Sequence, residues 1–145
     1  MAPKVKYTKV GEVHTFEIGL PGFEKIVIDH TNVPADQRGG VAKQLLAAAA
    51  LSCYSSALAG SLDARGAKYE KITGEATLGM GPNAVGQGRV KKINLEFNVD
   101  LPEEDDDIFQ RVVKIMKQGC LVTGSLHDGI EMSYDLKPSY AAEKE

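Results

Sequence analysis

One long helical segment constrains the fold of this chain more than any other feature. Across residues 41–65, apolar side chains recur at three- and four-residue spacing, and Gly66 provides a suitable C-terminal stop. Residues 47–50 are all alanine, so one face of the segment is small and lets another element approach closely. The sequence therefore predicts a central, buried helix over residues 41–65.

Segments with alternating apolar residues lie on both sides of this helix. Residues 5–10, 13–18 and 25–29 predict three short strands, which form a β-meander within residues 1–30. Residues 72–80 and 90–99 predict two longer strands, and the glycines between them suit a hairpin connection.

A second helix and a last strand complete the predicted order. Pro102 and the acidic residues after it start the helix, because carboxylates favour the positive end of a helix dipole. Its apolar stripe covers residues 108–116, and Gly119 ends it. Apolar residues alternate again over residues 130–136, which predicts the final strand.

The resulting order is βββ-α-ββ-α-β. Because strands and helices are not strictly interleaved, the fold class is α+β with mostly antiparallel sheets, not a doubly wound parallel sheet. The length of 145 residues fits one domain over residues 1–145. Within it, we expect N-terminal strands at 1–30, the central helix at 41–65 and a ββαβ portion at 67–137.

Charge and composition narrow the classes of function. A net charge of −3 argues against a nucleic-acid partner, and 6% aromatic residues argue against a base-stacking platform. Residues 1–6 lack the apolar stretch of a signal peptide. The longest apolar run, residues 45–51, is far shorter than the ~20 residues of a membrane-spanning helix. We therefore expect a cytoplasmic protein without a membrane partner.

Two cysteines are the residues best suited to carry chemistry. Cys53 lies inside the predicted central helix, and Cys120 follows the second helix in a turn flanked by glycines. In the cytoplasm, two cysteines are thiols or a working redox pair rather than a permanent disulfide. If the fold brings them together they form a redox pair, and otherwise they are small core residues.

Other polar clusters offer weaker sites. The acidic run at residues 103–107 lacks the spaced ligands and central glycine of a calcium loop, so a solvated helix start is the better interpretation. His14, His30 and His127 are not paired with His or Cys at a zinc-like spacing. His127 could lie near Cys120 if the intervening segment folds back; otherwise it is an ordinary loop histidine.

Two segments carry a family resemblance. Residues 42–53, AKQLLAAAALSC, are similar to a helix that runs into a first cysteine. Residues 112–123, VVKIMKQGCLVT, followed by residues 129–131, are similar to the region around a second cysteine. Together they resemble the osmotically inducible protein C / organic hydroperoxide resistance family (OsmC/Ohr), and the element order agrees over about residues 5–137.

This resemblance implies an intertwined homodimer, with two long central helices packed between sheets and active sites at the subunit interface. It also implies a thiol peroxidase for organic hydroperoxides. In that chemistry Cys53 is the peroxidatic thiolate and becomes a sulfenic acid, and Cys120 is the resolving thiol that forms a disulfide with it. An external dithiol or a lipoylated protein reduces the disulfide, and no metal, flavin or other cofactor is needed.

The chain departs from the family at a charged pair. Peroxidase members carry an Arg in the N-terminal strands and a Glu ten residues before the first cysteine. In this chain Lys43 stands at the position of the Glu, and no Arg precedes Arg38. Lys43 lies about 15 Å from Cys53 along a continuous helix, so it would act from a bent loop or across the dimer. Lys43 and Arg38 are the candidate thiolate-stabilising cations.

Three functions remain open on the sequence. The two retained cysteines favour the peroxidase. Loss of the Arg and Glu positions favours a dimeric binding protein with an apolar interface pocket and little peroxidase activity. A thiol-disulfide exchange or redox-sensing protein needs the cysteine pair but no peroxide pocket. The pKa of the Cys53 thiol separates both redox functions from the binding function.

Overall fold

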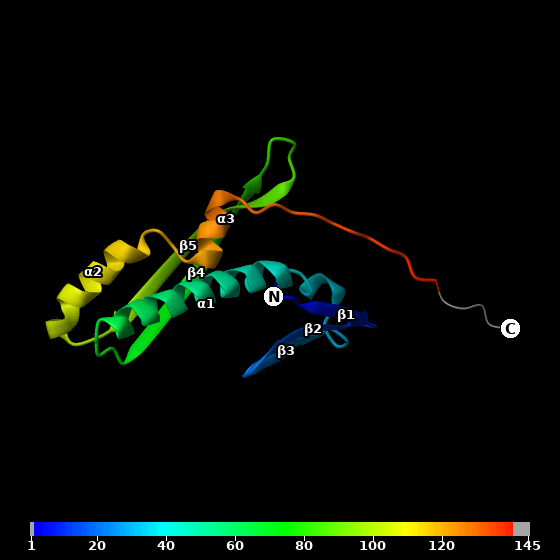
Figure 1. Ribbon diagram of the computed structural model, residues 1–145. Helices are drawn as coiled ribbons and strands as arrows, with labels where there is room; N and C mark the ends of the chain where they lie inside the picture. Colours follow the sequence, from blue (N-terminus) through cyan, green and yellow to red (C-terminus); the bar gives the residue numbers. More distant parts are fainter. Residues whose placement is uncertain (1, 141–145) are drawn as a thin grey trace. The chain divides into compact units, whose positions relative to one another are not determined.

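The strands and helices of the computed structural model follow the predicted order for most of the chain (Figure 1). The structure describes residues 2–140. The chain divides between Gln44 and Leu45 into two compact units, and each unit has its own sheet. The single domain expected over residues 1–145 stays a prediction.

The first unit contains a three-stranded antiparallel sheet in the order β1-β2-β3. Its strands are β1 (Lys6–Val10), β2 (Val13–Leu20) and β3 (Phe23–Asp29). The two hairpins are tight because Gly11 and Gly22 adopt positive φ angles, which side chains other than glycine rarely allow. The predicted β-meander is confirmed. A short 3-10 turn, η1 (Ala35–Gln37), follows the sheet.

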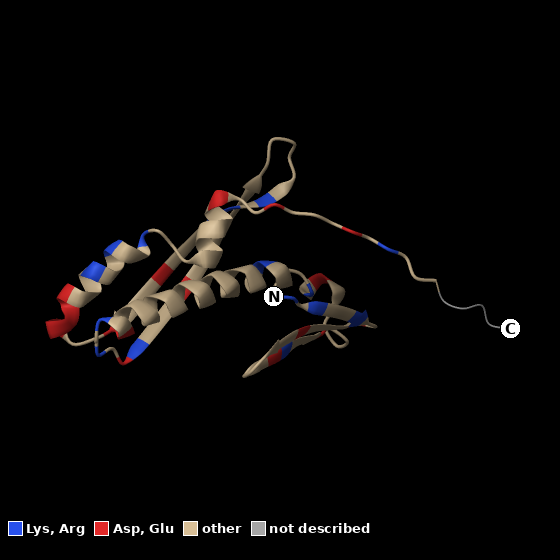
Figure 2. Cartoon of the chain, viewed as in Figure 1, with Lys and Arg blue, Asp and Glu red and all other residues tan. Residues whose placement is uncertain are grey.

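The second unit contains most of helix α1, a two-stranded antiparallel hairpin and two further helices. These elements are α1 (Val41–Ala64), β4 (Lys71–Pro82), β5 (Gly88–Asp100), η2 (Glu103–Asp105), α2 (Asp106–Met116) and α3 (Leu121–Asp128). Acidic residues gather at the start of α2, as the sequence predicted (Figure 2). The predictions of the long helix, the hairpin strands and α2 are therefore confirmed.

The core of the second unit lies where α1, α2 and the hairpin meet. Leu58 and Leu62 of α1 pack with Val112 and Met116 of α2, and all four side chains are buried. The spacing of four residues within each pair places both members on one helix face. Partly buried side chains surround this cluster: Tyr54, Ala57, Ala67, Tyr69, Ile72, Phe97, Val99, Ile108 and Phe109.

The final strand expected over residues 130–136 is wrong. The chain forms α3 directly after Cys120, and no helix or strand follows Gly129 in the described part of the chain. Ile130 and Leu136 are 53% and 93% exposed. Alternation gives a strand two distinct faces, but it does not provide the neighbouring strand whose backbone must pair with it. The observed order is therefore βββ-α-ββ-α-α.

The burial expected for the central helix holds for only part of α1. Its buried residues are Ala47, Ala50, Leu58 and Leu62. The helix is apolar on every side, so the hairpin and α2 cover only some of its apolar surface. By length and composition the stretch Ala35–Ala64 could also cross a membrane, although core helices of soluble proteins pass the same test.

Candidate functional site

The fold brings the two cysteines together. Cys53 lies in the interior of α1, and Cys120 is the residue immediately before α3. Both are free thiols and both are partly buried. The two thiols are close enough for each to shift the pKa of the other. Sequence patterns do not decide whether a pair forms, and the structure places both thiols at the first turn of α3.

The first turn of α3 surrounds both sulfur atoms. The backbone N–H of Val122 donates to Cys53 Sγ, with 3.4 Å between nitrogen and sulfur. The hydroxyl oxygen of Thr123 lies 3.1 Å from Cys120 Sγ and accepts a 2.9 Å hydrogen bond from the backbone N–H of Cys120. Cys120 and Thr123 therefore cap the start of α3 reciprocally.

The approach of Thr123 to Cys120 depends on Gly119. The φ angle of Gly119 is +77°, in the left-handed region that favours glycine. A Cβ atom at this position would lie 2.8 Å from the Thr123 hydroxyl oxygen, closer than a side-chain carbon normally approaches. Glycine is thus required for both the turn and the contact, whereas the sequence indicated only that it ends the preceding helix.

The two thiols have opposite pKa shifts. The pKa of Cys53 is raised, chiefly because its thiol donates a hydrogen bond to Cys120. Burial raises the pKa of Cys120, but hydrogen bonds from Cys53, from the Thr123 hydroxyl and from the N–H groups of Thr123 and Val122 outweigh burial, so that pKa is lowered. The hydrogen-bond donors at the start of α3 therefore favour a negative charge on Cys120.

Tyr54 connects α1 to the segment that leads into Cys120. Its hydroxyl donates a 2.9 Å hydrogen bond to the carbonyl of Met116, and its ring stacks on Phe97 with centroids 5.3 Å apart. Burial, and then the charge of Cys120, raise the pKa of Tyr54. Sequence patterns do not predict this role, because they do not show that α1 meets the end of α2.

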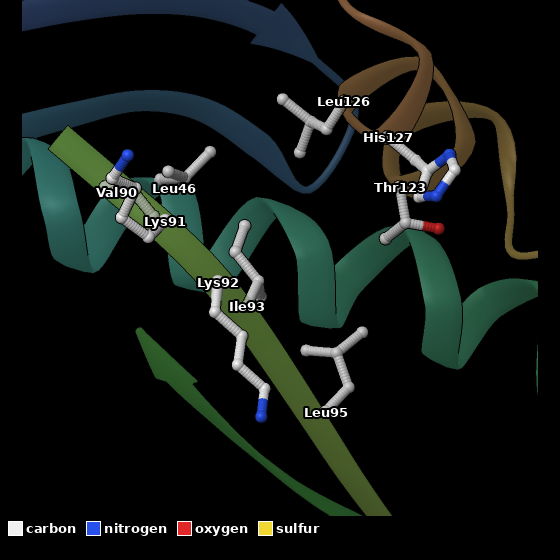
Figure 3. A pocket seen from close by; sticks show the side chains of 9 residues that line it. All are labelled: Leu46, Val90, Lys91, Lys92, Ile93, Leu95, Thr123, Leu126 and His127. Atoms are coloured by element: carbon white, nitrogen blue, oxygen red, sulfur yellow. The ribbon is translucent and has the colours of Figure 1, made fainter. Parts of the chain in front are cut away.

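A groove of about 540 Å³ lies between α1, β5 and α3 and includes Thr123, the residue that contacts Cys120 (Figure 3). It is lined from α1, β5 and α3 by Leu46, Val90, Lys91, Lys92, Ile93, Leu95, Thr123, Leu126 and His127. Most of these side chains are apolar, and Thr123 contacts Cys120 as well as lining the groove. His127 lies in the last turn of α3, so it borders the groove at the other end of the helix from Cys120. The groove suits a ligand with an apolar body.

The groups that shift the pKa values of the two cysteines all belong to the second unit, whereas both candidate cations belong to the first. In the first unit, Arg38 donates to the Glu12 carboxylate at 2.8 Å and to the Val33 carbonyl at 2.7 Å. Lys43 lies in the first turn of α1, is exposed and forms no ion pair with the described residues. The thiolate-stabilising role of these two residues stays a prediction.

A second hollow, of about 290 Å³, lies in the first unit beside β2 and β3. His14 and His30 both line it, and their ring centroids are 5.5 Å apart, a contact that their sequence positions did not reveal. The Tyr7 hydroxyl lies 2.7 Å from His14 Nδ1. Within residues 2–140, no group of three or more His, Cys, Asp or Glu side chains is arranged to hold a metal ion.

Comparison with known proteins identifies similar chains. Residues 36–135, most of the chain, match the family model described as OsmC-like protein. Among solved structures, an OsmC-like protein of unknown function from Vibrio cholerae O1 biovar eltor is 21% identical, with a TM-score of 0.59 over 79% of this chain and 78% of that one. An OsmC-like protein from Mycoplasma pneumoniae is 14% identical, with a TM-score of 0.65 over 88% of both chains.

A third similar structure is an organic hydroperoxide resistance protein from Elizabethkingia anophelis, solved with thiocyanate bound. It is 18% identical, with a TM-score of 0.57 over 90% of this chain and 93% of that one. No curated protein matches the chain significantly. At these identities the structural likeness shows the fold alone.

Proposed function

The chain belongs to the OsmC-like protein family, and from that premise we propose that it is a cysteine-based peroxidase that reduces organic hydroperoxides to alcohols. The observation that carries this proposal is the position of Cys53 and Cys120 at the first turn of α3, which contacts both sulfur atoms. A disulfide requires its two cysteines to lie close together, as the shared contacts with this turn suggest. The organic hydroperoxide resistance protein among the similar structures supports the same chemistry.

The proposed reaction starts from the pair that holds one proton. When Cys120 takes that proton, Cys53 becomes the thiolate, and its sulfur attacks the terminal oxygen of the hydroperoxide. The S–O bond forms, the O–O bond breaks, and the leaving alkoxide takes a proton from water to become the alcohol. The Cys120 thiol then condenses with the Cys53 sulfenic acid, so the S–S bond forms and the sulfenic oxygen leaves as water.

An external dithiol completes the cycle. A small dithiol or a lipoylated protein transfers two electrons and two protons to the Cys53–Cys120 disulfide and becomes a disulfide itself. The balanced sequence of steps needs no metal, flavin or other resident cofactor. Because such a cycle needs a reducing compartment, we propose a cytoplasmic location.

The groove beside the cysteine pair is the proposed binding site for the organic part of the substrate. Leu46, Ile93 and Leu95 provide an apolar wall, on which an alkyl or aryl group loses contact with water. Thr123 at its edge contacts Cys120, so a hydroperoxide group at this end of the ligand would be near the thiols. Hydrogen peroxide has no apolar part to bind, and we expect it to react more slowly.

We also propose that the working form is an intertwined homodimer. Large apolar side chains are exposed in both units, including Val10 at 73% and Tyr134 at 81%. The apolar surface of α1 is likewise only partly covered within one chain. A second copy of the chain would remove this surface from water, and closed two-fold pairs are the commonest assembly of soluble proteins. Sedimentation equilibrium measures the stoichiometry directly.

The deciding experiment is the intact mass of the reduced protein after one equivalent of cumene hydroperoxide, without added reductant. We expect the wild-type protein to lose two hydrogens, and neither C53S nor C120S to do so. In C120S, a sulfenic acid on Cys53 should be trapped by dimedone. Trapping on Cys120 in C53S, with none in C120S, would reverse the roles of the two cysteines. Two titratable thiols after unfolding of the treated wild-type protein would refute the peroxidase.

A second function is supported by a separate observation. Lys43 stands at the position of the family's Glu, and a groove with an apolar wall is present in the second unit. These features suit an OsmC-like dimeric protein that binds an apolar small molecule or exchanges thiols and disulfides, with little peroxidase activity. Oxidation by diamide but not by cumene hydroperoxide would favour this alternative.

A further inference from the structure

We propose that Thr123 is a positioning residue of the cysteine pair, whose hydroxyl and the first N–H groups of α3 together hold the negative charge of the thiolate in place of a cation. This inference deepens the peroxidase proposed above and rests on that proposal for its catalytic meaning. Its structural basis is the set of contacts at the first turn of α3, which is independent of any substrate.

The hydrogen-bond arrangement determines what the Thr123 hydroxyl can do. Its oxygen accepts the backbone N–H of Cys120 at 2.9 Å. A hydroxyl has one hydrogen and two acceptor positions, so the hydrogen of Thr123 remains available for Cys120 Sγ at 3.1 Å. A thiolate can only accept, and Thr123 is therefore the donor whenever Cys120 carries the charge. The same residue fixes the backbone of Cys120 and stabilises its anionic form.

Backbone N–H groups of the same turn add to this effect. The Val122 N–H donates to Cys53 Sγ at 3.4 Å, so one helical turn donates to both sulfur atoms. Unpaired N–H groups at a helix N-terminus carry partial positive charge, which favours an anion. Whichever sulfur holds the charge, the turn supplies a donor to it.

The titratable neighbours of Cys120 do not supply the missing charge. Cys53 and Tyr54, both on α1, face it, and each is neutral while it keeps its proton. His127 of α3, with Lys91 and Lys92 of β5, lines the groove, but none of them contributes to the pKa of either cysteine. Within the second unit, the donors of the α3 turn are therefore the main source of thiolate stabilisation.

The test replaces the Thr123 hydroxyl with a methyl group of nearly the same size, in Thr123→Val. We expect the absorbance of the thiolate at 240 nm to appear at higher pH than in the wild-type protein, and iodoacetamide to react about three- to tenfold more slowly at pH 7. Thr123→Ser keeps the hydroxyl and should restore both values. Ser125→Ala removes a hydroxyl that bonds only to the Leu121 carbonyl of the same helix, and should leave both values unchanged.

A second variant reaches the same contact through the backbone. Gly119→Ala places a Cβ against the Thr123 hydroxyl and should slow alkylation in the same direction as Thr123→Val. Gly66→Ala is the matched control, because Gly66 also follows a helix with φ of +72° but has nothing within 4 Å of the added Cβ. Both substitutions strain the turn, and only the first disturbs Thr123.

The outcomes separate this inference from the peroxidase proposal. Thiolate formation and alkylation need no peroxide, so they report on Thr123 even if cumene hydroperoxide is not reduced. Alkylation of Thr123→Val at the wild-type rate, or no rescue by Thr123→Ser, would overturn the role of Thr123 and leave the peroxidase standing. A slower reaction of Gly66→Ala equal to that of Gly119→Ala would also overturn it, because turn strain alone would then explain the effect.

Discussion

Replacing Tyr54 by Phe tests the link between α1 and the segment that carries Cys120. The substitution keeps the ring that stacks on Phe97 at 5.3 Å but removes the hydroxyl that donates to the Met116 carbonyl at 2.9 Å. A typical hydrogen bond contributes a net ~0.5–1.5 kcal/mol, and a buried acceptor left unpaired costs ~1–3 kcal/mol. Met116 is only 5% exposed. We therefore expect the free energy of unfolding to fall by about 1–2 kcal/mol.

Urea denaturation at one fixed protein concentration measures this loss, because any association would otherwise change the apparent stability. The midpoint should fall while the slope of the free energy against urea concentration stays unchanged. Tyr134→Phe is the matched control, since Tyr134 is 81% exposed and loses the same atom. Equal midpoints for the two variants would refute the reasoning, because the Tyr54 hydroxyl would then contribute no more than an exposed one.

Three further predictions follow from the core and the site. Leu62→Ala removes a side chain that is 0% exposed, so it should lower the free energy of unfolding by about 2–5 kcal/mol in urea. Gly74→Ala should lower it by about 1–3 kcal/mol, because the added Cβ would lie 2.6 Å from the Phe97 ring. Cys120→Ala should lower the pKa of Cys53, since the hydrogen bond to Cys120 is the largest cause that raises it; iodoacetamide should then react faster with Cys53 at pH 7.

Each of these predictions has its own control. Leu136→Ala removes the same atoms at a position that is 93% exposed, and a loss equal to that of Leu62→Ala would contradict the assigned core. Gly88→Ala adds a Cβ at a strand position with nothing within 4 Å, so it should cost less than Gly74→Ala. Slower alkylation of Cys53 in Cys120→Ala would contradict the claim that the hydrogen bond to Cys120 raises the pKa of Cys53.

Local sequence patterns were sufficient to predict those helices and strands whose formation depends mainly on their own residues. The predicted helix over residues 41–65 corresponds to α1 (Val41–Ala64), because helical spacing and a terminal glycine are both local signals. The long strands β4 and β5 were equally clear from alternation. The predicted strand at residues 130–136 failed because pairing needs a partner that the pattern does not identify.

The site depended on contacts that sequence patterns do not contain. Cys120 is not among the residues that usually cap a helix, so α3 gave no start signal, and the capping role of Thr123 became visible only with the geometry. The Val122 N–H donates to Cys53 Sγ although the two residues are 69 positions apart in the sequence. The cysteines were identified from residue type, whereas the groups that surround them were not.

The loss of a charged pair does not by itself argue against a reactive thiol in this chain. A cation stabilises a thiolate through its charge, and salt screens that interaction when the cation is exposed. The turn at the start of α3 stabilises a thiolate through the Val122 N–H and the Thr123 hydroxyl. The strength of these hydrogen bonds depends on the distance and the angle between donor and sulfur. Stabilisation of this kind requires a fixed backbone, and Gly119 provides the space in which that backbone can form. On the role proposed here for Thr123, the thiolate is stabilised by one helical turn of the second unit.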